Sequence, residues 1–231
     1  MTEGSSGYAM SSKIEERVKL LEFETLSDNH YKLHRATFNF RHSNGAWQTA
    51  SRESYNIGRS VAVLPMDLAR NLVLLTKQFR WPAFETGYRQ LLVEVVAGIV
   101  NRESSADCAH RETYEEAGVK LQLLSLFTEC FLSPGAVTER MSLYLATYDS
   151  TAARLGGGGL FHECEDIEVF EVSLDEALAM IARGEIIDAK TILLIQAAKL
   201  RPDLLDASRR QCVSRSSWQP SRALMHVSGA P

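Results

Sequence analysis

Three glutamates crowd one side of a short segment, residues 111–118, whose sequence is Arg-Glu-Thr-Tyr-Glu-Glu-Ala-Gly. On a helix with about 100° per residue, Glu115 lies about 60° to one side of Glu112 and Glu116 about 40° to the other. Like charges this close destabilise a helix, and its negative C-terminal end adds to the conflict. A bound divalent cation would resolve that conflict, and oxygen ligands favour Mg²⁺ or Mn²⁺ over Zn²⁺. On spacing alone, a solvated acidic face is the other interpretation.

Two further charged groups could act with this segment. Arg111 can orient a neighbouring carboxylate bidentately, although a surface ion pair of little energetic value has the same pattern. A second acidic cluster, Glu163, Glu165 and Asp166, follows the glycine run at residues 156–159. A mobile glycine loop could carry a base over the substrate only when it is bound. The alternative is a solvated charge run after a flexible linker.

The acidic segment needs a helix and a sheet to position it. We expect a helix over residues 106–117, capped by Ser104 or Ser105 and ended by Gly118. A capping box at residues 173–176 predicts a second helix that stops at Gly184, and a last helix covers residues 188–200. Apolar runs and turn signals predict strands at residues 60–64, 71–80, 91–96, 119–132, 141–148 and 167–172.

The N-terminal part reads as strands alone. Residues 18–53 contain short strands joined by turns, with a strong hairpin signal at Asn44-Gly45. Many strands with helices set between them indicate an α+β or α/β layered domain.

Composition and charge narrow the class of protein. The 231 residues are 45% hydrophobic and 23% charged, which is typical of a globular chain with one core. The net charge of −4 argues against nucleic acid as a partner, and no apolar run is long enough for a membrane helix. Four scattered cysteines and the lack of a signal peptide predict a cytoplasmic protein. We expect disorder in residues 1–12 and in a tail at residues 202–231.

Residues 97–119 resemble the Nudix box, Gly-x5-Glu-x7-Arg-Glu-U-x-Glu-Glu-x-Gly-U, in which U is aliphatic. The catalytic half is present with Thr113 at an aliphatic position, and Glu103 has the required spacing from the arginine. The loop half departs from the pattern because only four residues separate Gly98 from Glu103. Either Ala97 occupies the glycine position or the loop is one residue short, which leaves the role of Glu103 open.

The resemblance implies Mg²⁺-dependent hydrolysis, with Mn²⁺ as an alternative, of a nucleoside diphosphate joined to another group. Water would attack phosphorus, and catalysis would consist of positioning and charge neutralisation. The metal-binding groups implied are Glu112, Glu116, Glu165 and the main-chain carbonyl of Ala97. The catalytic groups implied are Arg111, Glu115 and Glu163. Glu163 is the candidate general base, whereas Glu115 is either another ligand or a neighbour of the ligands.

Beyond the box, most of residues 20–200 resemble the nucleotide-sugar branch of the family, the GDP-mannose and ADP-ribose pyrophosphatases. The stretch Ser-Pro-Gly-Ala-Val-Thr-Glu at residues 133–139 is similar to the GDP-mannose enzymes, although ADP-ribose enzymes also place a proline near Pro134. GDP-mannose is therefore the first candidate and ADP-ribose the second. The substrate contacts implied are His30, Arg52, Glu53, Arg80, Ala97, Gly98, Glu139 and Lys190. His30 would stack on the base from the partner subunit, unless Tyr31 takes that place.

The fold implied is the Nudix fold at residues 56–201, a mixed β-sheet sandwiched between helices. A small antiparallel β subdomain at residues 13–55 would pack or be exchanged across a homodimer and complete the substrate site. Two other hypotheses are a non-catalytic nucleotide-sugar sensor and an acidic helix that serves only as a protein-interaction surface. The sensor is less favoured because Arg111 and the three glutamates after it are all present. No nucleic-acid or membrane partner is expected.

Overall fold

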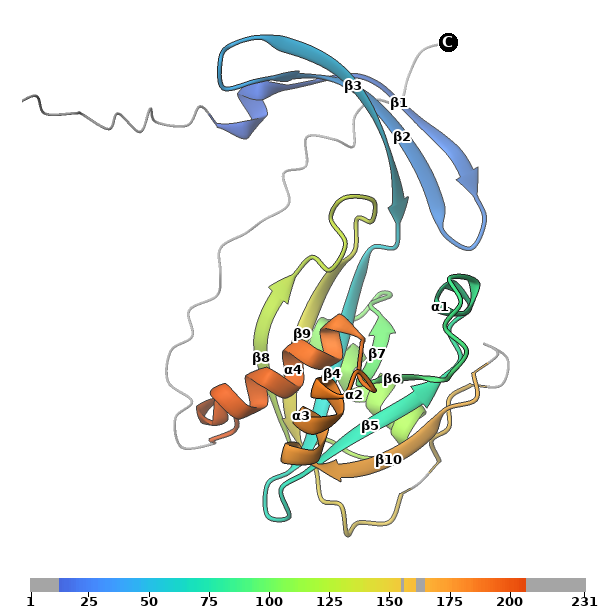
Figure 1. The fold of residues 1–231 in the computed structure, drawn as a ribbon, viewed down its shortest axis with the longest axis vertical. Helices are drawn as coiled ribbons and strands as arrows, with labels where there is room; N and C mark the ends of the chain where they lie inside the picture. The colour runs from blue at the N-terminus through green and yellow to red at the C-terminus, as the bar shows by residue number, and fades with distance from the viewer. Residues whose placement is uncertain (1–12, 155, 161–164, 207–231) are drawn as a thin grey trace, which may run out of the picture.

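A computed structural model describes residues 13–154, 156–160 and 165–206 and shows two β-sheets with helices around the larger one (Figure 1). The N-terminal sheet is antiparallel in the order β1-β2-β3. It contains the 3₁₀ turn η1 (Ile14–Arg17) and the strands β1 (Val18–Asp28), β2 (Lys32–Arg41) and β3 (Trp47–Asn56). The predicted hairpin joins β2 to β3, since Gly45 has a φ of 86° and Asn44 Oδ1 accepts a hydrogen bond from the main-chain N–H of Ala46 at 3.0 Å.

The larger sheet is mixed. Its main path runs β10-β5-β4-β9-β8, while β6 pairs with β5 and β7 with β4. Only β4 and β9 run parallel; the other pairs in this sheet are antiparallel within the described residues. Its strands are β4 (Arg59–Asp67), β5 (Leu72–Gln78), β6 (Leu92–Glu94), β7 (Val96–Ile99), β8 (Leu123–Cys130), β9 (Arg140–Thr147) and β10 (Glu168–Ser173).

Helices cover both faces of this sheet because its central strands are apolar on both sides. The helices are α1 (Trp81–Glu85), α2 (Ser105–Ala117), α3 (Leu174–Ala182) and α4 (Ala189–Leu200), followed by the 3₁₀ turn η3 (Pro202–Leu205). On β4, Ala62 and Leu64 pack with residues of α3 and α4, whereas Val61 and Val63 pack with residues of α2. The mixed sheet between helices, preceded by an antiparallel sheet, confirms the predicted fold class.

The helix ends follow their sequence signals. Ser104 caps α2 by accepting a hydrogen bond from the N–H of Asp107, and Gly118 ends it with a φ of 68°. Ser173 caps α3 in the same way through the N–H of Glu176. Asp188 caps α4 by accepting from the N–H of Thr191.

Three local predictions differ from the structure. The strand expected at residues 71–80 is shorter, since β5 covers Leu72–Gln78 and the short helix α1, with a proline in its first turn, begins at Trp81. The buried run at residues 91–96 is divided at Val95 into β6 and β7, which pair with different strands. The strand expected at residues 119–132 is shorter, since β8 covers Leu123–Cys130. Beyond the expected domain end at residue 201, the turn η3 follows, and its Leu205 is only 5% exposed and packs in the core.

In the described ranges, no helix has the length and apolar character needed to cross a membrane.

Candidate active site

The acidic face of α2 lies against β7, where a glycine permits close approach. A Cβ atom at Gly98 would lie 2.0 Å from both Cδ and Oε1 of Glu112, so a side chain there would collide with this carboxyl group. One turn later, Glu116 is only 2% exposed. Its Oε2 atom has no hydrogen-bond partner among the described residues. Two carboxyl groups of one helix therefore enter the interior, and one of them carries an unpaired oxygen.

Arg111 holds the other side of this acidic face. Its Nη1 atom lies 2.8 Å from Oε2 of Glu115 and 2.9 Å from Oε1 of Glu112, and its Nη2 atom lies 2.7 Å from Oε1 of Glu103. Hydrogen bonding to Glu103 raises the pKa of Arg111 and lowers that of Glu103. Arg111 thus orients three carboxylates, as its position before Glu112 suggested. The partner of Glu103 is this arginine.

The buried carboxyl groups disfavour their own negative charge. Burial raises the pKa of Glu112 to about 7, with repulsion from Glu115 and Glu165 added to it and Arg111 opposing it. Burial and then repulsion from Glu112 hold the pKa of Glu116 well above its usual range. A divalent cation would remove both penalties, so the donor set fits a hard cation such as Mg²⁺.

The third carboxylate expected at the metal is near Glu112 and Glu116 but has a main-chain partner. Glu165 Oε2 accepts a hydrogen bond from the N–H of Leu160 at 2.9 Å. Accordingly, no three Asp, Glu, His or Cys side chains in the described part of the chain are gathered closely enough to hold a metal ion. The loop before Glu165 is nevertheless attached to α2, since Gly158 and Gly159 donate to the carbonyl groups of Glu116 and Glu115 at 2.8 and 3.3 Å. Glu163, the expected base, lies outside the described residues.

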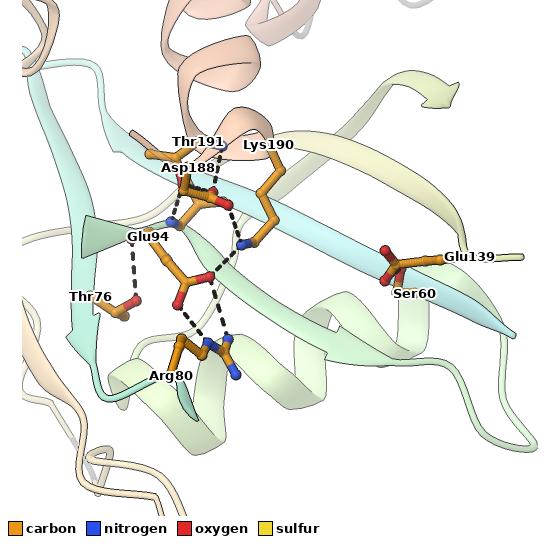
Figure 2. Close-up of polar contacts among 9 residues, drawn as sticks. Ser60, Thr76, Arg80, Glu94, Glu139, Asp188, Lys190 and Thr191 are labelled. Carbon is orange, nitrogen blue, oxygen red and sulfur yellow. Dashed lines mark hydrogen bonds and ion pairs between the residues drawn. The ribbon is translucent and has the colours of Figure 1, made fainter. Parts of the chain in front are cut away.

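Two cations predicted to bind substrate share one buried carboxylate (Figure 2). Glu94, at the end of β6, is 2% exposed. Arg80 Nε donates to its Oε2 at 2.7 Å, and Lys190 Nζ donates to its Oε1. Lys190 also contacts Asp188 Oδ1 at 2.9 Å. The structure therefore brings Arg80 and Lys190 together from opposite ends of the domain sequence.

The turn between β1 and β2 also reaches this region. Burial and the charge of Glu139 raise the pKa of Tyr31, and Arg80 opposes that shift, so Tyr31 lies near both residues in the same chain. His30, the predicted stacking residue, is exposed and contacts the Tyr31 ring at 4.3 Å between centroids. Glu139 accepts a hydrogen bond from Ser60 Oγ at 2.8 Å. Figure 2 shows that this pair lies apart from the cluster of Arg80, Glu94 and Lys190.

Comparison with known families agrees with this geometry. A family model described as the NUDIX domain matches residues 56–195, which is more than half of the chain. The chain belongs to the Nudix family. A second model, described as the GDP-mannose pyrophosphatase NudK N-terminal domain, matches residues 17–55.

Relatives within the Nudix family match this chain over nearly their whole length. The chain is 37% identical over 193 residues to the GDP-mannose pyrophosphatase of Pectobacterium atrosepticum, covering 83% of this chain and 97% of that protein. It is 33% identical over 181 residues to the GDP-mannose pyrophosphatase of Escherichia coli, covering 78% and 94%. A crystal structure of an ADP compounds hydrolase has a TM-score of 0.65 at 16% identity and covers 84% of this chain and 97% of that one. At this identity the likeness shows the fold alone.

Some predicted substrate contacts of this Nudix protein lie apart from the carboxylate helix. Arg52 and Glu53 are exposed on β3 of the N-terminal sheet, opposite Ala36 and Arg35 of β2. Arg52 Nη1 donates to the carbonyl of Ser51 at 2.8 Å. Ala97, the expected source of a main-chain ligand, pairs with Ala62 beside Gly98.

Sequence reasoning missed several polar residues of the Nudix domain. Glu94 was visible as a charge inside an apolar run, and Asp188 as a cap before a helix, but neither pattern names a partner. Thr191 Oγ1 accepts from the N–H of Val95 at 2.8 Å, which compensates the backbone for the break between β6 and β7. Gln78 has a buried Nε2 atom with no hydrogen-bond partner among the described residues.

The raised carboxyl pKa values give the metal-free protein a pH-dependent stability. A carboxyl group with a raised folded-state pKa stabilises the fold below its unfolded pKa of about 4.3 and loses that effect as pH rises through the folded value. For Glu112 that value is about 7. In EDTA we expect the melting temperature to fall by on the order of 5 °C between about pH 5 and about pH 8. In the double variant Glu112→Gln/Glu116→Gln the decline should be clearly shallower; an unchanged slope would contradict the assignment.

Proposed function

We propose that this protein hydrolyses the diphosphate of GDP-mannose to GMP and mannose 1-phosphate in a Mg²⁺-dependent reaction, with Mn²⁺ as a second usable ion. The observation that carries the proposal is the buried pair Glu112 and Glu116, whose unpaired oxygen and raised pKa values call for a cation. The relatives named GDP-mannose pyrophosphatase, covered over almost their full length, support the choice of substrate.

Each side chain would have a distinct task. Glu112, Glu116 and the Ala97 carbonyl would hold the ion, with Glu165 added if it leaves the N–H of Leu160. The ion, when bound, would neutralise charge on the diphosphate and lower the pKa of the attacking water. Arg111 keeps the acidic face in place through Glu103 and Glu115.

The substrate itself would be held by residues outside α2. Arg80 and Lys190 would bind the diphosphate, and Gly98, whose Cβ position is filled by Glu112, would contact it through its main chain. Glu139 would contact the sugar or base, with His30 or Tyr31 stacked on the base. We retain Glu163 as the general base.

Kinetics with two substrates test this proposal. We expect kcat/KM for GDP-mannose to exceed that for ADP-ribose by about tenfold or more, because the two substrates present different bases and sugars to the site in the transition state. Turnover should stop in EDTA and return with Mg²⁺. A preference for ADP-ribose would assign the protein to that second substrate. Saturable binding without hydrolysis of either compound would favour the sensor hypothesis.

We also propose a homodimer formed through the N-terminal sheet. The outer strand β1 leaves Leu21 and Phe23 exposed by 56% and 55%, and exposed apolar side chains of this kind mark an interaction surface. Arg52 and Glu53, exposed on the same sheet, could then reach the partner's site. Sedimentation should show a species of twice 25.8 kDa, reduced to the monomer by Leu21→Lys/Phe23→Lys.

The free thiols of Cys108 and Cys130 suit a reducing compartment, and we propose a cytoplasmic location. Recovery of the protein in the membrane fraction of its cells would contradict it.

A further inference from the structure

We infer that Glu94 is a positioning residue, which holds Arg80 and Lys190 at the spacing that the substrate diphosphate requires. The inference rests on the proposed function, because it gives these two cations the diphosphate as their ligand. Glu94 is expected to act through them and not by contact with the reacting atoms.

The contacts of Glu94 reach elements that are distant in the sequence. Arg80 directly precedes α1, Lys190 is in the first turn of α4, and Glu94 ends β6 between them. Oε2 of Glu94 accepts from Arg80 Nε, while its Oε1 accepts from Lys190 Nζ and, at 3.5 Å, from Arg80 Nη2. One buried carboxylate thus fixes the relative position of two positive groups (Figure 2).

The two cations keep donors for a ligand. The side chain of Arg80 is 39% exposed while that of Glu94 is 3% exposed, so Glu94 contacts the buried edge of the guanidinium group. Arg80 Nη1 has no hydrogen-bond partner among the described residues, and Figure 2 shows that atom directed away from Glu94. Lys190, whose side chain is 9% exposed, uses two of its three N–H donors on Glu94 and Asp188 and has one left. The outward edge of the Arg80 guanidinium and the remaining N–H donor of Lys190 can donate hydrogen bonds to the oxygens of a diphosphate.

A merely structural role explains these contacts less well. The attachment of α4 to the sheet is already made by Thr191, whose Oγ1 accepts from Val95 N–H and donates to Asp188 Oδ2 at 2.6 Å. A buried ion pair is in general weak evidence for stability, because the desolvation of its charges offsets their attraction. Thr191 therefore still attaches α4 to the sheet when Glu94 is replaced, whereas Arg80 and Lys190 would then repel each other.

The same residues lie next to the metal-binding carboxylates. Glu116 experiences the charges of both Arg80 and Glu94. A diphosphate bound by the two cations would therefore lie near the ion held by α2. This proximity makes the spacing of Arg80 and Lys190 relevant to the reaction.

Replacement Glu94→Gln tests the inference, because glutamine keeps the shape but offers only one accepting oxygen. We expect KM for GDP-mannose and Kd for inorganic pyrophosphate to rise by roughly 10- to 100-fold, with a smaller change in kcat. Glu94→Asp, which keeps the charge, should restore part of the affinity. In a chain that already carries Arg80→Ala, adding Glu94→Gln should raise KM by clearly less than it does in the wild type.

A matched control is Asp67→Asn. Asp67 is also buried, at 4% exposure, and accepts hydrogen bonds from Arg70 at 3.1 Å and from Ser150 Oγ at 2.6 Å. It is the last residue of β4 and, among the described residues, makes no hydrogen bond to Glu94. We expect this variant to lose melting temperature without a comparable rise in KM. An equal rise in both variants would overturn the positioning role in favour of a general loss of structure.

The outcomes separate this inference from the proposed function. Unchanged KM and unchanged pyrophosphate affinity in Glu94→Gln, with wild-type hydrolysis of GDP-mannose, would overturn the role of Glu94 and leave the function intact. Weakened pyrophosphate binding, in a protein whose wild type does not hydrolyse GDP-mannose, would support Glu94 and reject the proposed substrate. Equal effects of Glu94→Gln with and without Arg80→Ala would also overturn the inference.

Discussion

Replacement of Glu116 by glutamine is expected to lower kcat for GDP-mannose by roughly 100-fold or more, since even partners of metal ligands are worth about 10- to 100-fold. Glu116 is 2% exposed and its Oε2 atom has no protein partner among the described residues. In the proposed site this oxygen would bind the cation, so the loss of its charge should weaken the metal site. Steady-state turnover at saturating Mg²⁺ measures the loss.

The stability of the metal-free protein should not be lowered by Glu116→Gln. In EDTA the melting temperature should not fall, because a neutral amide avoids the cost of a buried charge. The rise in melting temperature that Mg²⁺ gives the wild type should be lost. Glu176→Gln on the exposed side of α3 serves as the control and should keep both activity and the Mg²⁺ effect. Near-wild-type turnover in Glu116→Gln at saturating Mg²⁺ would reject the metal site.

The second large effect is expected from Gly98→Ala. The added methyl group would lie 2.0 Å from Oε1 of Glu112, so the carboxyl group must move away from β7. A displacement of about 1 Å in a catalytic site can cost about 100-fold in rate, and we expect kcat/KM to fall by that order. The cost in unfolding free energy should be about 1–3 kcal/mol, which is typical of one excess methyl group.

Gly135→Ala provides the matched control for this glycine. A Cβ atom at Gly135 would meet nothing within 4 Å, so the same substitution should leave kcat/KM unchanged. Normal activity in Gly98→Ala would mean that Glu112 does not need its position against β7, and the assignment of Glu112 as a ligand would then fail.

Local signals explain how much of this site could be predicted. Helical periodicity and the cap at Ser104 depend on neighbouring residues, so the sequence places Glu112 and Glu116 on one face of α2. The apolar runs in β4 and β5 likewise indicate strands buried on both faces. Within the family resemblance, the spacing of Glu103 from Arg111 matches the contact between them.

Long-range pairing explains what could not be predicted. Glu94 and Lys190 are 96 residues apart in the sequence, and nothing in either local pattern shows that one carboxylate serves two cations. The break at Val95 depends on which strands neighbour β6 and β7, which is a property of the whole sheet. The docking of Gly158 on the carbonyl of Glu116 also depends on tertiary contact, whereas the glycine run alone suggested a mobile loop.

We infer that the carboxylate pair of α2 supports Mg²⁺-dependent cleavage of GDP-mannose. The most direct test is to incubate the wild type and Glu116→Gln with GDP-mannose and Mg²⁺ and to identify the products by chromatography. We predict GMP and mannose 1-phosphate in equal amounts from the wild type and only traces from the variant. Intact GDP-mannose in both samples, or equal product from both, would contradict the account.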